Sequence, residues 1–475
     1  ELTMDTIFAT LGTNKGSLRL YLQGEHLARN EFAKGVRYDR LLNDETGKIV
    51  LRRSDYGQYI VSGKNKKSSD TPIPVIDINT NELAAICDEG ERLKITLSEG
   101  VIEISTHHLE VNRRIREAHF NMAMKKRHFT KGVFCVGIGM ATLAMQQGFH
   151  AQGFTSETSW VVDRDLSYLN VFMRQNPACS TNTQVHCAKL EELEPADLTP
   201  VNVCQFSLDC AAHSKSGKSK NGFSVAEQHE GTTGAYGLLK SLERINAGVY
   251  ISENVEEAMN STTYMLIKST LQHLGYIIYE TVLDSTQSGC IENRPRYWML
   301  AISKGLAFNL DVTIPHYPRT FETLGELMED IDDDSEMWSE NTYLKEKAIR
   351  DAKAGKGFKR QLVDESTTQI GVINRHYAKR QSTPPMIVRA DGMERLFTVS
   401  EHAKIKGCTL SLIEGLGFTL GHEGLGQGID MKQGQGISEF LIMAMTQVYT
   451  TPVIETKPKS ESIPSQASLF DSLLV

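Results

Sequence analysis

A cysteine at the end of an apolar stretch is the first place in the chain where residue types suggest chemistry. Cys210 follows the apolar residues 201–208 and precedes a polar, lysine-rich turn. A cysteine thiol becomes nucleophilic when nearby positive charge stabilises its thiolate and solvent can reach it. Glu253 ends a second apolar stretch, residues 249–252, where a carboxyl group can act as a general acid. The two residues indicate covalent catalysis assisted by proton transfer.

A glycine pair and an acid indicate a nucleoside ligand. Gly137 and Gly139 come directly after the apolar residues 133–136 and before a predicted helix. Glycines at such a turn let the backbone approach a ligand and leave the helix N-terminus free to face it. Asp163 follows the next predicted strand, where an acid would bind ribose hydroxyls.

The elements that must position these residues alternate between strand and helix from Lys131 to about residue 305. This alternation predicts an α/β fold, a doubly wound parallel sheet with crossover helices. Ligands of such sheets bind at the carboxyl ends of the strands, and every candidate residue lies at a predicted strand end. Further on, we expect a glycine-rich segment over residues 421–436 and then a helix over residues 438–448.

The first hundred or so residues contain an imperfect duplication. Apolar and glycine positions recur at similar spacing: Leu20, Leu22, Leu27, Gly35, Gly47, Ile49 and Leu51 have counterparts in Ile76, Ile78, Leu83, Gly90, Gly100, Ile102 and Ile104. Each half predicts a strand, a short helical turn, a strand, a glycine turn and a strand. Two such halves would pair into one β-rich domain.

The order of the chemical motifs resembles the cytosine-C5 DNA methyltransferases of bacteria and phages. The resemblance spans roughly residues 130–450. It rests on Gly137 and Gly139, Asp163, Cys210 with Ser214 four residues on, Glu253-Asn254-Val255, Arg294 and Arg296, and the segments 401–407 and 434–437. It implies a Rossmann-like methyltransferase sheet that binds S-adenosylmethionine, with a small target-recognition domain and no metal.

The repeat at the N-terminus resembles the swapped-hairpin fold of AbrB- and SymE-like proteins. Binding of DNA and a purely structural or dimerising role both remain open for it. The expected division is an N-terminal β-rich domain (1–106), a basic linker helix (107–130), a catalytic methyltransferase domain (131–305), a target-recognition domain (306–395), a return to the catalytic domain (396–450) and a tail (451–475).

The resemblance assigns roles to individual residues. The catalytic residues are Cys210, Glu253, Arg294 and Arg296, and the cofactor-binding residues are Gly137, Gly139, Asp163 and Gly436. Contacts with double-stranded DNA are expected from Ser214, Lys215, Lys218, Lys220, Arg375, Lys379 and Arg380.

The mechanism that the resemblance implies begins with addition of the Cys210 thiolate to C6 of cytosine. Glu253 supports protonation at N3, so that C5 attacks the methyl group of S-adenosylmethionine. Arg294 and Arg296 would hold the cytosine O2 or a neighbouring phosphate. The base must leave the duplex to be reached, and the lysine-rich turn would close over the flipped nucleotide.

Several positions depart from the family pattern. Leu208 and Asp209 replace two prolines, Glu292 replaces a glutamine, Met140 replaces a glycine, and Cys135 stands where phenylalanine is usual. Asp209 matters most, because a carboxylate beside the nucleophile disfavours a thiolate unless it turns away. Cys204 lies inside a predicted strand, so Cys210 is preferred as the nucleophile.

Composition limits the alternatives. The net charge of −8 excludes a wholly basic nucleic-acid binder, and the eight cysteines include no Cys-x-x-Cys pair, which disfavours a zinc ribbon. No run of about 18 apolar residues occurs, so we expect a cytoplasmic protein outside the membrane, in a bacterial or phage-infected cell.

Two other readings of function remain open at this stage. One is a tRNA cytosine-C5 methyltransferase of the same fold, and the other is a DNA-binding protein with a degenerate methyltransferase domain. Near the end of the chain, from Gln466 to Phe470, the sequence Gln-Ala-Ser-Leu-Phe resembles the peptide that binds the bacterial sliding clamp, a possible partner.

Overall fold

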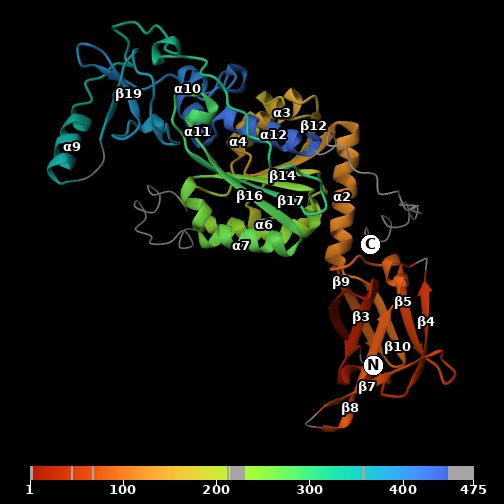
Figure 1. Ribbon diagram of the computed structural model, residues 1–475. Coiled ribbons are helices and arrows are strands. Elements are labelled where there is room, and N and C mark those ends of the chain that lie inside the picture. The colour runs from red at the N-terminus through yellow and green to blue at the C-terminus, as the bar shows by residue number, and fades with distance from the viewer. Residues whose placement is uncertain are drawn as a thin grey trace.

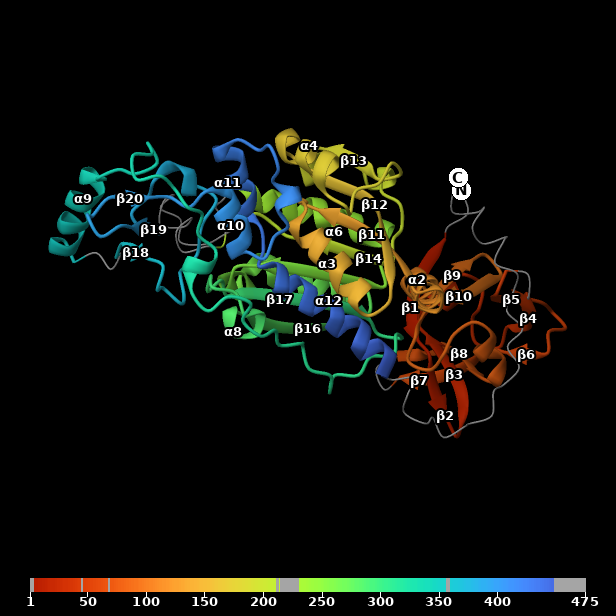
Figure 2. The same cartoon turned by 90° about the horizontal axis from the view of Figure 1, so that it is seen from above.

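The computed structural model describes residues 4–43, 46–66, 69–210, 213, 230–355 and 359–447. A β-rich N-terminal region, a central α/β body and a smaller mixed region follow one another along the chain (Figure 1). Figure 2 shows that the N-terminal strands and the smaller region lie at opposite ends of the body. Within the described residues, no helix combines the length and apolar content that crossing a bilayer requires.

The N-terminal region consists mainly of two sheets. One has the strand order β1-β9-β10-β5-β4-β6 and the other β2-β3-β8-β7. The elements are β1 (Asp5–Thr10), β2 (Gly12–Asn14), β3 (Ser17–Gln23), α1 (Glu25–Arg29), β4 (Arg37–Asn43), β5 (Lys48–Arg53), β6 (Tyr59–Ile60), β7 (Ser62–Lys66), β8 (Ser69–Asn79), η1 (Asn81–Ala85), β9 (Arg92–Ser98) and β10 (Val101–Thr106).

The strand register relates the two halves of the N-terminal region by an approximate two-fold axis. Leu20 pairs with Ile78 and Leu22 with Ile76, across the antiparallel strands β3 and β8. The outer repeat positions pair in the same reciprocal way, Ile49 with Ile104 and Leu51 with Ile102. All eight side chains are buried in one core. The repeat positions predicted from spacing therefore lie together at the centre of this region, where each pairs with the counterpart of its neighbouring repeat position.

The body is a sheet with the order β13-β12-β11-β14-β15-β17-β16. Its strands are β11 (His128–Phe134), β12 (Thr155–Asp163), β13 (Gln184–Cys187), β14 (Val203–Phe206), β15 (Val249–Asn254), β16 (Tyr276–Leu283) and β17 (Arg296–Ser303). The strands from β11 to β15 run parallel, as predicted. β17 runs antiparallel to both of its neighbours, which the sequence pattern did not reveal.

Helices cover both faces of this sheet (Figure 1). One face carries α3 (Met140–Ala151), α4 (Leu166–Gln175) and α12 (Met431–Thr446), and the other carries α6 (Gly234–Ile245) and α7 (Thr262–His273). Shorter elements are η2 (Leu190–Glu192), η3 (Pro195–Asp197), η5 (Glu230–Thr233), η6 (Glu256–Asn260) and α8 (Ser285–Ser288). The expected α/β fold is thus present.

The helix expected over residues 438–448 begins earlier than predicted. α12 starts at Met431, because the Asp430 carboxylate accepts hydrogen bonds from the backbone N–H groups of Lys432 and Gln433. The glycines that suggested an irregular segment lie inside the helix. A Cβ on Gly434 would come within 2.9 Å of the Ala144 Cβ, so the glycine permits close packing of α12 on α3.

The smaller region follows β17 and returns to the body through two helices. It contains η7 (Leu324–Glu326), α9 (Thr342–Lys353), β18 (Gln361–Val363), η8 (Tyr377–Lys379), β19 (Pro385–Val388) and β20 (Glu394–Arg395), followed by α10 (Val399–Ile405), η9 (Leu410–Leu412) and α11 (Phe418–Gln427). A separate apolar cluster that includes Ile370, Tyr377 and Phe397 forms its core.

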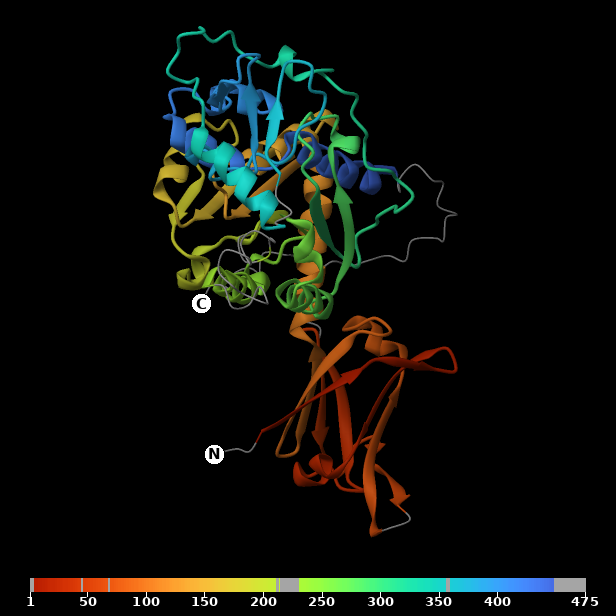
Figure 3. The ribbon, with the colours of Figure 1, turned by 90° about the vertical axis from the view of Figure 1, so that its left-hand side faces the viewer.

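The predicted linker helix is α2 (His108–Lys126), which joins the N-terminal region to the body (Figure 3). Near its start, Arg113 and Arg114 both form ion pairs with Glu91 of the N-terminal region. One turn further on, the buried Arg116 faces the body. The helix is therefore tied to both parts by charged side chains.

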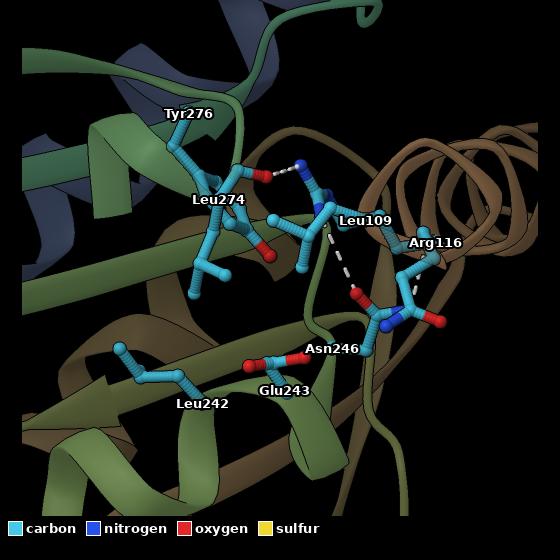
Figure 4. A pocket seen from close by; sticks show the side chains of 8 residues that line it. Leu109, Arg116, Leu242, Glu243, Asn246, Leu274 and Tyr276 are labelled. Carbon is cyan, nitrogen blue, oxygen red and sulfur yellow. Dashed lines mark hydrogen bonds between the residues drawn. The ribbon is translucent and has the colours of Figure 1, made fainter. Parts of the chain in front are cut away.

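Arg116 lies beside a small cavity that α2 forms with the body (Figure 4). Its Nε donates to Ser303 Oγ at 2.8 Å and its Nη2 to the Leu274 carbonyl at 2.7 Å. Its guanidinium stacks over the Tyr276 ring, 4.0 Å from the centroid. Buried hydrogen bonds from a charged donor are strong, so Arg116 ties α2 firmly to the body.

Replacing Arg116 by alanine should lower the stability of the body. The Leu274 carbonyl and Ser303 would lose buried donors, at a cost of about 3 kcal/mol. Thermal unfolding followed by circular dichroism measures the change. Lys125→Ala, at an exposed position of the same helix, is the control and should have little effect. Equal melting temperatures for the two variants would contradict this role of Arg116.

Candidate active site

The carboxyl ends of the parallel strands bring the predicted residues to one edge of the sheet. Cys210 follows β14, and Glu253 lies near the end of β15. Because β17 is antiparallel, its first residue, Arg296, lies at this same edge, where Tyr297 pairs with Asn254. The structure thus brings together the four residues predicted to be catalytic.

Glu253 and Arg296 form a buried ion pair. Arg296 Nε lies 2.9 Å from Glu253 Oε1, and both residues are 8% exposed. The other carboxylate oxygen, Oε2, accepts a hydrogen bond from Ser207 Oγ at 3.2 Å. Burial is the main cause that lowers the pKa of Arg296, while Glu253 opposes it. The carboxylate is held from two sides, with a fixed orientation.

Cys210 is exposed to solvent on one side. The protein atoms around its thiol withhold water and raise its pKa, and Arg296 and Arg294 act in the opposite direction. The neighbouring Asp209 raises the pKa as well, as its position suggested. Asp209 is, however, paired with Arg164, whose Nη2 lies 3.2 Å from its Oδ2. Arg164 thus offsets part of the negative charge beside the nucleophile.

The main chain before Cys210 is fixed by Asn254. Its Nδ2 donates to the Leu208 carbonyl at 2.9 Å, and Tyr264 OH lies 3.2 Å from the same nitrogen. A buried amide with two partners restricts the chain that leads to the nucleophile. Asn254 belongs to the predicted Glu253-Asn254-Val255 motif, but the sequence did not predict its contact with the Leu208 carbonyl.

Arg294 lies beside the ion pair and is 3% exposed. Its Nη2 donates to the Gly426 carbonyl at 3.0 Å, and its Nη1 lies 3.5 Å from Glu292 Oε1. Its Nε and Nη1 have no hydrogen-bond partner among the described residues. Nη1 is held only by its longer ion contact with Glu292, and a buried donor without an acceptor, such as Nε, is costly, so this site suits a ligand that brings an acceptor oxygen.

The glycine turn lies at the same edge, in front of α3. Gly137 and Gly139 have φ angles of +55° and +84°, which favour glycine. The Gly137 N–H donates to Asp163 Oδ2 at 2.7 Å. α3 begins without a side-chain cap, so its first N–H groups can face a ligand. Burial raises the pKa of Asp163. This arrangement fits the nucleoside part of the expected cofactor.

Gly436 lies apart from this turn. It is inside α12, where an added Cβ would come within 2.9 Å of Gln287 Nε2 and 3.3 Å of Tyr317 Cε2. Close packing against these two side chains is enough to favour glycine at this position, and no ligand contact is needed to account for it. A role of Gly436 in cofactor binding stays a prediction.

The predicted DNA contacts differ in their surroundings. Lys379 is exposed, whereas Arg380 donates to Asn341 Oδ1 and to the Met337 carbonyl, both at 3.1 Å. Arg375 lies 5.8 Å from the Tyr168 ring centroid. Ser214, Lys215, Lys218 and Lys220 lie outside the described residues. Among the described residues, no group of three or more potential metal ligands gathers.

Cys204, the rejected alternative nucleophile, is fully buried within β14. It packs in the apolar cluster beneath α6 and α7, and burial raises its pKa well above the usual value. This environment is that of a structural cysteine.

Two residues of the site were not anticipated: Ser207, which binds Glu253, and Arg164, which binds Asp209. Arg164 directly follows the predicted strand-end acid Asp163, so its place at the same edge was a usable signal. The pairing itself joins residues 45 positions apart, which no local pattern indicates.

The sequence model of the family described as C-5 cytosine-specific DNA methylase matches residues 134–412. The type II methyltransferase M.SsoII of Shigella sonnei is 22% identical over 263 residues, which cover 54% of this chain and 68% of that protein. M.NlaX of Neisseria lactamica is 24% identical over 237 residues, 45% of this chain and 72% of that protein. M.MspI of a Moraxella species is 23% identical, and the match covers 44% of this chain and 50% of that protein.

Two solved structures share the fold. The methyltransferase EhMeth of Entamoeba histolytica aligns with a TM-score of 0.54 at 15% identity, over 66% of this chain and 98% of its own. The Dnmt2 methyltransferase of S. pombe aligns with a TM-score of 0.50 at 16% identity, over the same shares. At these identities the likeness supports the α/β methyltransferase fold.

Gly139→Ala should weaken both folding and binding of S-adenosylmethionine, the expected cofactor. A Cβ would lie 2.2 Å from Asn176 Nδ2 and 2.5 Å from Phe172 Cδ2. Gly392 has the same φ of +84° but nothing within 4 Å. Gly392→Ala therefore costs only the backbone strain, about 1 kcal/mol, and should bind normally. Thermal unfolding and titration calorimetry test this, and similar losses in both variants would contradict it.

Alkylation of Cys210 should accelerate with pH. Burial raises the pKa of this thiol above its usual range, so the thiolate fraction and the rate with iodoacetamide should grow by up to about tenfold per pH unit as long as the pH stays below that pKa. Arg296→Gln removes the main cause that lowers this pKa and should slow the reaction at each pH. Peptide mass spectrometry measures the rate, with the exposed Cys187 as internal reference. Faster labelling in the variant, or rapid labelling of the buried Cys204, would refute this account.

Proposed function

This chain belongs to the C-5 cytosine-specific DNA methylase family, and we propose that Cys210 and Glu253 methylate a flipped cytosine through a covalent bond to C6. The observation that carries the assignment is the buried Glu253–Arg296 pair at the strand edge where Cys210 lies. The enzyme is a DNA cytosine-5 methyltransferase with an α/β fold.

In the proposed reaction the Cys210 thiolate forms a bond to C6, and the electrons of the C5–C6 double bond move toward C5. The carboxyl group of Glu253 supports the proton at N3, because Arg296 and Ser207 hold its orientation. The electron pair at C5 forms the bond to the methyl group that S-adenosylmethionine would supply when bound. A base such as solvent water then takes the C5 proton, the electrons of that C–H bond re-form the C5–C6 double bond, and Cys210 leaves C6 as the thiolate. The base reaches the thiol only outside the duplex stack.

Arg294 is proposed to bind the O2 atom of the cytosine. Its Nε is a buried donor without a hydrogen-bond acceptor among the described residues, and a carbonyl oxygen supplies the acceptor that it lacks. Arg294 is held by the Gly426 carbonyl, so its position is defined before substrate binds.

The proposed cofactor is S-adenosylmethionine, which supplies an electrophilic methyl group when bound. Gly137, Gly139 and Asp163 would hold its nucleoside part, since the turn is open on the ligand side. A Cβ on Gly137 would meet only Gln427 Nε2, at 3.4 Å. The uncapped N-terminus of α3 adds free backbone donors.

Double-stranded DNA is the proposed acceptor, and residues 306–395 are proposed as the target-recognition domain. The relatives named as type II methyltransferases favour DNA over tRNA as the acceptor. They also favour an origin in a bacterium or phage, and we therefore propose that the enzyme acts in the cytoplasm. The clamp-binding peptide, residues 466–470, is kept as a proposal and lies outside the described residues.

We infer that residues 1–106 form an AbrB/SymE-like domain made of two swapped hairpins within one chain. The reciprocal pairing of Leu20 with Ile78 and of Leu22 with Ile76 supports this inference, because it is the register that a two-fold axis would generate.

Cells that express the protein should carry 5-methylcytosine at one defined sequence, which bisulfite sequencing of their DNA detects. Cys210→Ala should reduce methylation by more than about a thousandfold, because the covalent step is lost. Cys204→Ala is the matched control and should methylate nearly as the parent does.

The comparison of acceptors separates the remaining functions. Purified enzyme with radiolabelled S-adenosylmethionine should label plasmid DNA and leave tRNA unlabelled. Labelled tRNA would support the alternative activity, and no labelling of either would support a DNA-binding protein with an inactive methyltransferase domain. Full activity of Cys210→Ala together with an inactive Cys204→Ala would reverse the assignment of the nucleophile.

A further inference from the structure

We propose that Glu292 and Lys406 form a buried ion pair that positions Arg294 and thereby sets the charge beside Cys210. This inference rests on the proposed function, since it concerns the same active site. Glu292 stands where the family pattern has a glutamine. Both residues would act on the reaction indirectly, by holding Arg294 in position.

The pair lies entirely inside the protein. Lys406 Nζ donates to Glu292 Oε2 at 2.6 Å, and the two side chains are 0% and 1% exposed. A single charge at such a position would be strongly disfavoured, whereas two opposite charges in contact can be held. The carboxylate introduced at position 292 is therefore compensated by a cation from a distant segment.

Glu292 uses its second oxygen to reach the active site and the recognition region. Glu292 Oε1 lies 3.5 Å from Arg294 Nη1 and accepts a hydrogen bond from the Ile373 N–H at 2.8 Å. The chain beside it pairs with the same segment, because Asn293 N donates to the Ile370 carbonyl. The Glu292 carboxylate thus contacts both Arg294 and the segment 370–373 of the smaller region.

Lys406 controls how strongly Glu292 attracts Arg294. With Lys406 in place, the carboxylate shares its charge between two cations. Without Lys406, its charge falls on Arg294 alone, which reduces the positive field that Arg294 contributes at Cys210. Burial and the nearby Arg294 lower the pKa of Lys406 to about 8, in keeping with a crowded group of cations.

The direction of the effect on Cys210 follows from its charged neighbours. Arg296 and Arg294 lower the pKa of the thiol, while Asp209 and Glu253 raise it, and Arg164 pairs with Asp209. Lys406→Gln adds net negative charge beside this group and should raise the thiol pKa. Glu292→Gln removes negative charge and should lower it. The double variant Glu292→Gln/Lys406→Gln keeps the net charge and should return toward the parent.

The experiment measures the pH profile of Cys210 alkylation by iodoacetamide in the full chain without DNA. At about pH 6.5, below both the thiol pKa and the pKa of about 8 of Lys406, Lys406→Gln should react roughly threefold more slowly, and Glu292→Gln roughly threefold faster, than the parent. The double variant and Lys406→Arg should stay close to the parent. Opposite shifts that cancel cannot arise from a general loss of stability.

Methyl transfer to unmethylated plasmid DNA gives the second readout. Each single glutamine variant should lower kcat about tenfold while KM for S-adenosylmethionine stays similar, and the double variant should recover part of the loss. Glu394→Gln is the matched control, since Glu394 is also buried and ion-paired, with Arg360, but within the smaller region. It should lower the melting temperature and leave the alkylation profile unchanged.

The possible results separate this inference from the proposed function. If the parent enzyme methylates DNA but both single variants keep the parent alkylation profile, the inference is wrong and the function stands. If the parent transfers no methyl group, the proposed function fails while the alkylation shifts still test the pair. If a single variant does not fold, the double variant and Lys406→Arg still test the inference. An alkylation profile of either one that departs from that of the parent would overturn it.

Discussion

The buried pair of Glu253 and Arg296 is the interaction on which the catalytic arrangement depends. Each residue is 8% exposed, and either charge without the other would be strongly disfavoured in this place. The pair exists because β17 runs antiparallel to β15 and begins at the edge where β15 ends. A parallel β17 would put Arg296 at the opposite edge of the sheet, far from Cys210. The direction of one strand therefore decides whether the acid is held in position.

The same principle extends to the other carboxylates near the nucleophile. Asp209 pairs with Arg164, and Glu292 pairs with Lys406, so each acid has a cation from a different segment. Without these partners the carboxylates would raise the pKa of the Cys210 thiol further and make the reactive thiolate scarcer. Charge pairing thus allows the chain to keep acids where the family pattern has a proline and a glutamine. The cost of those substitutions is offset by long-range contacts.

Sequence periodicity predicted the sheet, the linker helix and the grouping of strand-end residues, because these follow from local patterns. It could not predict the direction of β17, since a reversed strand has the same alternation of residues. It placed the start of the last helix too late, because residues 421–436 are rich in glycine, although Gly434 lies within the helix and permits contact with Ala144. The contact of Arg164 with Asp209 joins residues 45 positions apart and became visible only in three dimensions.

The position of Arg116 limits what the N-terminal region can do. Arg116 binds beside Tyr276 and Ser303, which pair with each other at one end of β16 and β17. Arg296 is at the other end of β17, seven residues from Ser303, which is about 23 Å of extended chain. The N-terminal region is therefore attached at the edge of the sheet opposite to the nucleophile. Any contact it makes with DNA would fall on a part of the duplex other than the flipped base.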